Sequence, residues 1–136
     1  EYALNILNDF DYIGALVIEF FVAKDGRLIA NEMAPRVHNS GHWSIEGCSM
    51  SQFQAHIRAI TGTLDCPASD FKSCIMLNVL SKYPNKEELN KLGKHFFHSY
   101  GKDERKLRKL GHITLVDENY ENLIKSVTKF LEILDS

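Results

Sequence analysis

The sequence predicts an α+β fold in which antiparallel strands are interspersed with amphipathic helices. An apolar run from Gly14 to Ala23 precedes Asp25-Gly26, a strong two-residue hairpin signal, and a second strand-like run from Arg27 to Ala34 follows it. Towards the C-terminus, apolar residues recur at helical spacing: Tyr120, Leu123, Ile124, Val127, Phe130, Leu131 and Leu134. These patterns indicate a hairpin early in the chain and a long helix at its end.

The other elements follow from similar patterns. Residues 1–10 carry an apolar stripe typical of the end of a helix, and Ser51–Thr61 is predicted to be a helix capped by Ser51. Pro35 to Gly47 is predicted to be an irregular loop. In the second half we expect three strands, Cys74–Leu80, His95–Tyr100 and Gly111–Val116. A short helix, Lys86–Leu92, would follow the first strand, and a charged turn, Gly101–Leu110, would follow the second.

A linker is predicted between these halves. The stretch from Thr63 to Phe71 contains Pro67, Ser69 and two Asp residues, and it has no periodic apolar pattern. We therefore expect two parts, residues 1–62 and residues 63–136, of which the second is a small α+β unit. The chain has no initiator Met, so we also expect it to start inside a larger protein.

Composition excludes several classes of partner. The formal net charge is -2, so no global field attracts nucleic acid, and no apolar run approaches the ~20 residues that span a bilayer. Cys48, Cys66 and Cys74 are odd in number and lack a C-x-x-C spacing, which is typical of reduced thiols in a cytosolic protein. We expect a cytoplasmic protein without a signal peptide.

The hairpin places two acids opposite each other. If Asp25-Gly26 is the whole loop, Lys24 pairs with Arg27, and counting back pair by pair places Glu19 opposite Glu32. Their Cβ atoms would then lie about 4.5–5.5 Å apart, which is unfavourable for two like charges. Protonation of one acid, a bridging Arg or a divalent cation such as magnesium would relieve the repulsion. A different register, or two solvated acids, remains the alternative.

The loop after the second strand is rich in polar side chains. Arg36 can form a fork with a carboxylate, phosphate or carbonate, and His38, Asn39 and Ser40 add short-range donors and acceptors. The i, i+4 spacing of His38 and His42 would suit zinc on a helix, but Pro35 and Gly41 disfavour a helix here. A polar-ligand site and a loop that satisfies its own backbone both remain open.

A basic cluster marks the second half. Five of the chain's sixteen Lys and Arg residues fall within eight positions, namely Lys102, Arg105, Lys106, Arg108 and Lys109. Such a cluster suits a phosphate monoester, and it is equally compatible with a solvated turn. Nucleic acid is less favoured because few aromatic residues lie among these cations.

Two long motifs resemble a known family. The run from Asn31 to Trp43, continued by Glu46-Gly47, Ser51-Gln52-Phe53, His56 and Arg58-Ala59, closely resembles the C-terminal part of 5-(carboxyamino)imidazole ribonucleotide synthase. This family comprises ATP-grasp enzymes of purine synthesis. The run from Lys102 to His112 is similar to the basic C-terminal signature of the same family.

The resemblance implies an ATP-dependent carboxylating ligase. Members of this family convert ATP and bicarbonate to carboxyphosphate and ADP, and then transfer the carboxyl group to the amine of 5-aminoimidazole ribonucleotide with release of phosphate. By resemblance, Glu19 and Glu32 would hold the magnesium that binds ATP. Catalysis and binding of bicarbonate, carboxyphosphate and the imidazole would involve Arg36 and His38, with Asn39 and Ser40 also binding substrate. The ribotide phosphate would be held by Lys102 with one of Arg105, Arg108 or Lys109.

The resemblance also implies what surrounds the chain. Residues 1–62 would be the C-terminal part of an ATP-grasp domain, an antiparallel hairpin plus helices, and residues 63–136 a small C-terminal α+β domain. The N-terminal part of the same enzyme would be a partner, the intact protein would be a homodimer, and the chain alone would not turn over. Two alternatives stand beside this: another ATP-grasp ligase or formyltransferase of purine synthesis, and a non-catalytic anion-binding module.

Overall fold

The computed structural model describes the backbone of residues 1–134 and the side chains of residues 1–132. The chain divides into two compact units. The first unit comprises Glu1–Ile45 and Met50–Ser69, and the second comprises Glu46–Ser49 and the described chain from Asp70 onward. The division into residues 1–62 and 63–136 remains a proposal.

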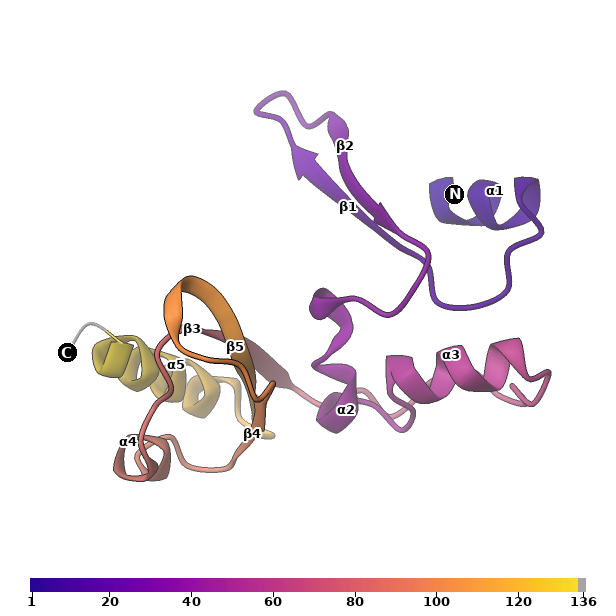
Figure 1. Cartoon of the computed structure of the whole chain (residues 1–136). Coiled ribbons are helices and arrows are strands. Elements are labelled where there is room, and N and C mark those ends of the chain that lie inside the picture. The colour runs from indigo at the N-terminus through magenta and orange to yellow at the C-terminus, as the bar shows by residue number, and fades with distance from the viewer. Residues whose placement is uncertain (135–136) are drawn as a thin grey trace. The chain divides into compact units, whose positions relative to one another are not determined.

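The first unit consists of a hairpin and helices (Figure 1). Strands β1 (Val17–Val22) and β2 (Leu28–Ala34) pair as a two-stranded antiparallel sheet. Helix α1 (Tyr2–Asp9) precedes the hairpin, and α3 (Gln52–Ile60) follows the polar loop. These elements confirm the predicted order, although β1 begins three residues later than Gly14, which has a φ of +139°.

The polar loop contains two short helical segments that the sequence analysis did not predict. A 3-10 turn, η1 (Asn39–Gly41), begins after His38, and α2 (Ser44–Gly47) follows it. Helix α3 then begins at the predicted cap: Ser51 Oγ accepts from Gln54 N, and Gln54 Oε1 accepts from Ser51 N. This reciprocal capping box fixes the start of α3 and thereby the end of the loop.

The second unit is a three-stranded antiparallel sheet with helices (Figure 1). It contains β3 (Cys74–Ser81), α4 (Lys86–Asn90), β4 (His95–Ser99), β5 (Arg105–Val116) and α5 (Tyr120–Leu134), with β5 in the centre of the order β3-β5-β4. The predicted charged turn over Gly101–Leu110 was therefore too long. Arg105–Leu110 form the first half of β5, because bulged pairing with the end of β3 extends the strand beyond β4.

The core lies in the second unit, where α5 packs against β3 and β5. Its buried residues come from β3, β5, α5 and the turn that follows α4: Val79, Leu92, Leu110, Ile113, Leu115, Leu123 and Phe130. The predicted buried face of α5 is confirmed at Leu123, Val127 and Phe130. It is wrong at Tyr120, Ile124 and Leu131, which are exposed, and the side chain of Leu134 lies outside the described residues. Among the described helices, none has the length and apolar character needed to cross a membrane.

Candidate functional site

The β1–β2 turn differs from the predicted two-residue loop. Ala23 N donates to Arg27 O at 2.8 Å and Gly26 N donates to Ala23 O at 2.9 Å, so three residues, Lys24 to Gly26, form the loop. Gly26 has a φ of +83°, a conformation that glycine adopts without steric cost. Next to the turn the pairing is therefore Val22 with Leu28, one position away from the prediction.

A β-bulge then restores the predicted pairing of the two acids. Phe20 pairs with Ala30, whereas Glu19 pairs with Glu32, so Asn31 is the extra residue of the bulge. The Nδ2 atom of Asn31 lies 3.5 Å from Glu19 Oε2. The expectation that Glu19 and Glu32 face each other is confirmed. The three-residue turn shifts the strand register by one position, and the bulge at Asn31 shifts it back.

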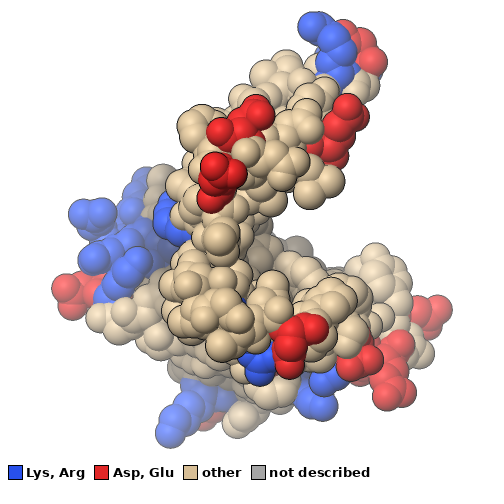
Figure 2. Space-filling view, turned by 90° about the vertical axis from the view of Figure 1, so that its right-hand side faces the viewer, with Lys and Arg blue, Asp and Glu red and all other residues tan. Residues whose placement is uncertain are grey.

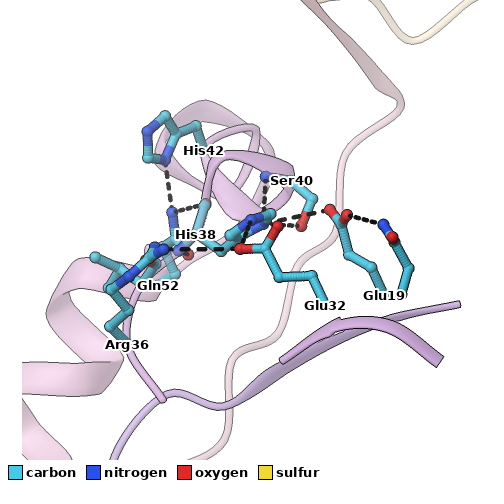
Figure 3. Close-up of polar contacts among 9 residues, drawn as sticks. Glu19, Glu32, Arg36, His38, Ser40, His42 and Gln52 are labelled. Carbon is cyan, nitrogen blue, oxygen red and sulfur yellow. Dashed lines mark hydrogen bonds and ion pairs between the residues drawn. The ribbon is translucent and has the colours of Figure 1, made fainter. Parts of the chain in front are cut away.

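His38 lies between the paired acids (Figure 3). Its Nδ1 atom is 3.5 Å from Glu19 Oε1, and its Nε2 atom is 3.6 Å from Glu32 Oε1. One ligand atom from each of these three residues lies within 4.8 Å of the others, which makes them a candidate metal cluster. Arg36 adds a cation, because its Nη2 atom is 3.8 Å from Glu32 Oε1. The guanidinium of Arg36 therefore offsets part of the repulsion between the two carboxylates, and His38 lies against both of them.

Gln52, at the start of α3, holds the polar loop in this position. Its Oε1 atom accepts from His38 N at 2.9 Å, and its Nε2 atom donates to His38 O at 2.8 Å. The same Nε2 lies 2.6 Å from His42 Nδ1 (Figure 3). One amide thus fixes both backbone polar groups of His38 and orients the ring of His42. The sequence analysis did not assign Gln52 a role, because its only signal was its place in the resembling motif.

Close packing around Gln52 explains a glycine of the loop. A Cβ atom built on Gly41 would collide with Gln52 Oε1, so any larger residue would displace the amide. Ser44 Oγ donates to Gly41 O at 2.6 Å and accepts from Gln52 N at 2.9 Å, which ties the loop to the first turn of α3. His56 has a structural contact, because its Nδ1 atom accepts from Ala15 N at 3.0 Å.

The remaining loop residues lie beside His38. Ser40 contacts its ring twice, through Oγ at 2.9 Å and through the backbone N–H at 3.3 Å from Nδ1. Asn39 lies in η1, directly after His38. Arg36 Nη1 donates to Val37 O at 2.9 Å. The loop therefore presents imidazole, guanidinium and hydroxyl groups next to the carboxylates, a combination suited to an anion bound beside a cation.

The basic residues belong to the second unit. Lys102 precedes β5, whereas Arg105, Arg108 and Lys109 lie within it. Ser81 pairs with Arg105 and Leu80 with Lys109, so the three residues between them, 106–108, form a bulge, and Leu107 has a φ of +61°. Figure 2 shows one dense group of Lys and Arg side chains (left), in keeping with five cations in eight positions. This surface can attract a phosphate group.

Comparison with known protein families defines the class. The ATP-grasp domain family matches residues 1–53, and the phosphoribosylaminoimidazole carboxylase C-terminal domain family matches residues 74–126. The chain therefore resembles an ATP-grasp segment followed by that C-terminal domain. The expected α+β architecture is thereby confirmed.

Individual relatives point to one enzyme. The chain is 44% identical over 116 residues to the N5-carboxyaminoimidazole ribonucleotide synthase of Brucella melitensis, covering 84% of this chain and 32% of that protein. The synthase of Staphylococcus haemolyticus is 41% identical over 132 residues, or 93% of this chain and 35% of its own length. The chain thus resembles these synthases over most of its length and spans about a third of theirs.

Solved structures give the same result. The crystal structure of the synthetase from Thermus thermophilus superposes with a TM-score of 0.84 at 39% identity, covering 97% of this chain and 36% of that one. The synthase of Aspergillus clavatus, solved with ADP and 5-aminoimidazole ribonucleotide, gives a TM-score of 0.72 at 31% identity and covers 90% and 35%. The predicted resemblance to this family is confirmed.

Proposed function

We propose that the full-length protein carrying this chain carboxylates 5-aminoimidazole ribonucleotide with ATP and bicarbonate. A bicarbonate oxygen attacks the γ-phosphorus of ATP and forms carboxyphosphate and ADP. The exocyclic amine of the imidazole then takes the carboxyl group, phosphate leaves, and N5-carboxyaminoimidazole ribonucleotide results. The observation that carries this proposal is the cluster of Glu19, Glu32 and His38 beside Arg36, in a chain similar to the synthases.

The carboxylate pair fits a magnesium ion. Glu19 and Glu32 offer hard oxygen ligands on adjacent strands, and Mg²⁺ commonly takes one or two carboxylates together with substrate phosphates. Bound there, Mg²⁺ would neutralise the negative charge of the ATP phosphates. Occupancy by a cation would also remove the repulsion that Arg36 now offsets in part, leaving the guanidinium available to substrate.

The polar loop would bind the carboxyl donor. Arg36 can hold two oxygens of bicarbonate or carboxyphosphate through its guanidinium fork. Because Ser40 N donates to Nδ1 of His38, a neutral His38 carries its proton on Nε2, and that N–H can be donated to a substrate oxygen. Asn39 and Ser40 add neutral donors that orient the planar carboxyl group. These groups stabilise the developing charge and position the reactants, which is the main contribution of a protein to phosphoryl transfer.

The basic cluster would hold the other end of the imidazole substrate. We propose that Lys102 and one of Arg105, Arg108 or Lys109 bind the ribotide phosphate. We further propose a cytoplasmic, homodimeric enzyme whose remaining sequence completes the ATP site, because the related synthases are about three times as long as this chain.

The decisive experiment measures ADP release by the full-length protein. We expect release that depends on both bicarbonate and 5-aminoimidazole ribonucleotide, and Glu32→Gln should reduce kcat at least ~100-fold by weakening the metal site. Glu121→Gln, at an exposed position of α5, is the matched control and should retain full activity. Release without the ribotide, or full activity in Glu32→Gln, would contradict the proposed reaction.

A further inference from the structure

The basic loop, defined as Lys102–Lys109, comprises the turn before β5 and the bulged start of that strand, and its backbone is fixed despite its charge. Its five cations repel one another, and an isolated loop of this composition would sample many conformations. In the structure, however, one short segment, Ser81–Tyr83 at the end of β3, contacts this loop at three separate points.

Tyr83 connects both arms of the loop. Its hydroxyl accepts from Lys102 N at 3.1 Å and lies 3.0 Å from Lys102 O and 3.2 Å from Leu110 O, to which it can donate. Its backbone N–H donates to Glu104 Oε1 at 2.8 Å. The Tyr83 ring meets Phe97 edge to face at 6.2 Å between centroids, and both residues pack against the core. The hydroxyl thus ties the backbone of Lys102 to the rigid part of the unit.

The third contact holds a strained turn. Leu107 N donates to Ser81 Oγ at 2.8 Å, and these two residues have φ values of +61° and +69°. Side chains other than glycine rarely adopt this backbone conformation, and it persists only where the surroundings fix it. The loop is therefore held in one shape at both ends and at its tip.

Tyr100 supports the side chain of Lys102. The Lys102 ammonium lies 5.2 Å from the centre of the Tyr100 ring, within the range of a cation–π contact. The Tyr100 hydroxyl is 2.9 Å from Nδ1 of His112, which is 2% exposed and stacks on His98 at 4.6 Å. His98 in turn bonds Glu46 at 2.7 Å. Burial raises the pKa of Tyr100, so its hydroxyl stays protonated and can donate to His112.

We propose that Tyr83 and Tyr100 are positioning residues for Lys102. Tyr83 fixes its backbone and Tyr100 its ammonium, in an arrangement ready to receive a phosphate monoester, without either tyrosine touching that phosphate. This inference rests on the proposed function, in which Lys102 binds the ribotide phosphate. A loop that is already ordered loses less conformational entropy on binding, and the gain appears as affinity for the phosphate-bearing substrate.

The test compares substrate affinities in the full-length protein. Tyr83→Phe removes the hydroxyl and keeps the ring against Phe97. We expect the KM for 5-aminoimidazole ribonucleotide to rise about tenfold, while kcat and the KM for ATP change less than about twofold. Tyr100→Phe keeps the ring beneath Lys102, loses the contact with His112 and should give a smaller rise. Tyr120→Phe, an exposed tyrosine of α5, is the matched control and should change nothing.

A double variant separates positioning from a general structural role. Lys102→Met alone should raise the ribotide KM, and adding Tyr83→Phe to it should raise that KM much less than Tyr83→Phe does in the wild type. An unchanged ribotide KM in Tyr83→Phe, or effects that simply multiply in the double variant, would overturn the inference. So would an equal rise in the KM for ATP.

Inorganic phosphate separates this inference from the proposed function. If the wild-type protein releases no ADP with the ribotide, the proposed function fails, and the loop is then tested by calorimetric titration with phosphate alone. Weaker phosphate binding by Tyr83→Phe than by Tyr120→Phe supports the positioning role. Equal phosphate binding by the two variants rejects it.

Discussion

The two units of the chain are stabilised in different ways. In the second unit, seven buried apolar residues form one core beneath a three-stranded sheet. Among the described residues of the first unit, only Ala34 and Met50 are buried apolar residues, and large side chains such as Phe10 and Val22 are 75% and 72% exposed. Figure 2 shows uncharged surface exposed between groups of acidic side chains. The second unit thus depends on burial and the first on local hydrogen bonds.

The same difference applies to the two candidate sites, because each site is held by the kind of contact that stabilises its own unit. The acidic cluster is set by a hairpin register, a bulge and one amide from α3. The basic loop is set by contacts that lead back to the core through Tyr83 and Phe97. A two-stranded hairpin is only marginally stable by itself in water. We therefore expect the first site to be the more easily disturbed one.

The largest effect is expected from removing core volume in the second unit. Phe130→Ala, at a side chain 1% exposed, should destabilise that unit by about 3–5 kcal/mol, because it leaves a cavity. Phe21→Ala is the matched control, because the Phe21 side chain is 60% exposed, and it should change stability by less than ~0.5 kcal/mol. Urea unfolding of residues 1–136, followed by circular dichroism, measures both. Equal losses would show that the units do not differ as described.

The next effect concerns the first site. Gln52→Leu removes three contacts of one amide and should release His38 and His42, so kcat of the full-length protein should fall about 10- to 100-fold. The substituted chain should still contain α3, because the capping box is made by Ser51 and Gln54.

Gln54→Leu provides the control two residues away. It removes the return bond of the capping box and should cost about 0.5–1 kcal/mol of stability while leaving kcat within about twofold. If both glutamine variants lose activity to the same extent, the amide of Gln52 does not act on the loop specifically.

The smallest effect is a difference in pH dependence. Burial, and then the neighbouring Cys48 and Glu46, raise the pKa of Cys74 above its ordinary value of 9.0, and burial raises the pKa of Tyr100 above 10.0. The unfolded chain ionises first, so the stability of the second unit is intact below pH 9 and falls as the pH rises above it.

In the first unit, hydrogen bonds from Arg27 lower the pKa of Asp25 below 3.8, so the stability they add is present above that pH and lost below it.

Urea midpoints measured at several pH values check both signs. Cys74→Ala and Tyr100→Phe should each flatten the alkaline loss, and Asp25→Asn should flatten the acid loss. Trp43 is the only Trp and lies in the first unit, so its fluorescence separates that unit from the signal of the whole chain. A loss of Trp43 signal between pH 9 and 11 that Cys74→Ala abolishes would contradict the assignment.

The amino-acid sequence alone is sufficient to locate the elements and the chemical groups. Apolar patterns, turn residues and helix caps located the hairpin, α3, α5 and the strands, because these signals depend on residues close in sequence. The pairing of Glu19 with Glu32 was predicted from the hairpin, and the polar and basic clusters were visible as unusual compositions. Patterns of this kind depend on neighbours in sequence, so a single chain contains them.

The way in which these groups are held depends on contacts between separate elements. The three-residue turn and the bulge at Asn31 cancel each other, and no local pattern distinguishes that register from a simple hairpin. Arg105 to Leu110 became strand because the end of β3 pairs with them. The contacts of Gln52 with His38, and of Tyr83 with Lys102, join residues 14 and 19 positions apart. Such contacts form only when separate elements pack together, and no sequence periodicity encodes them.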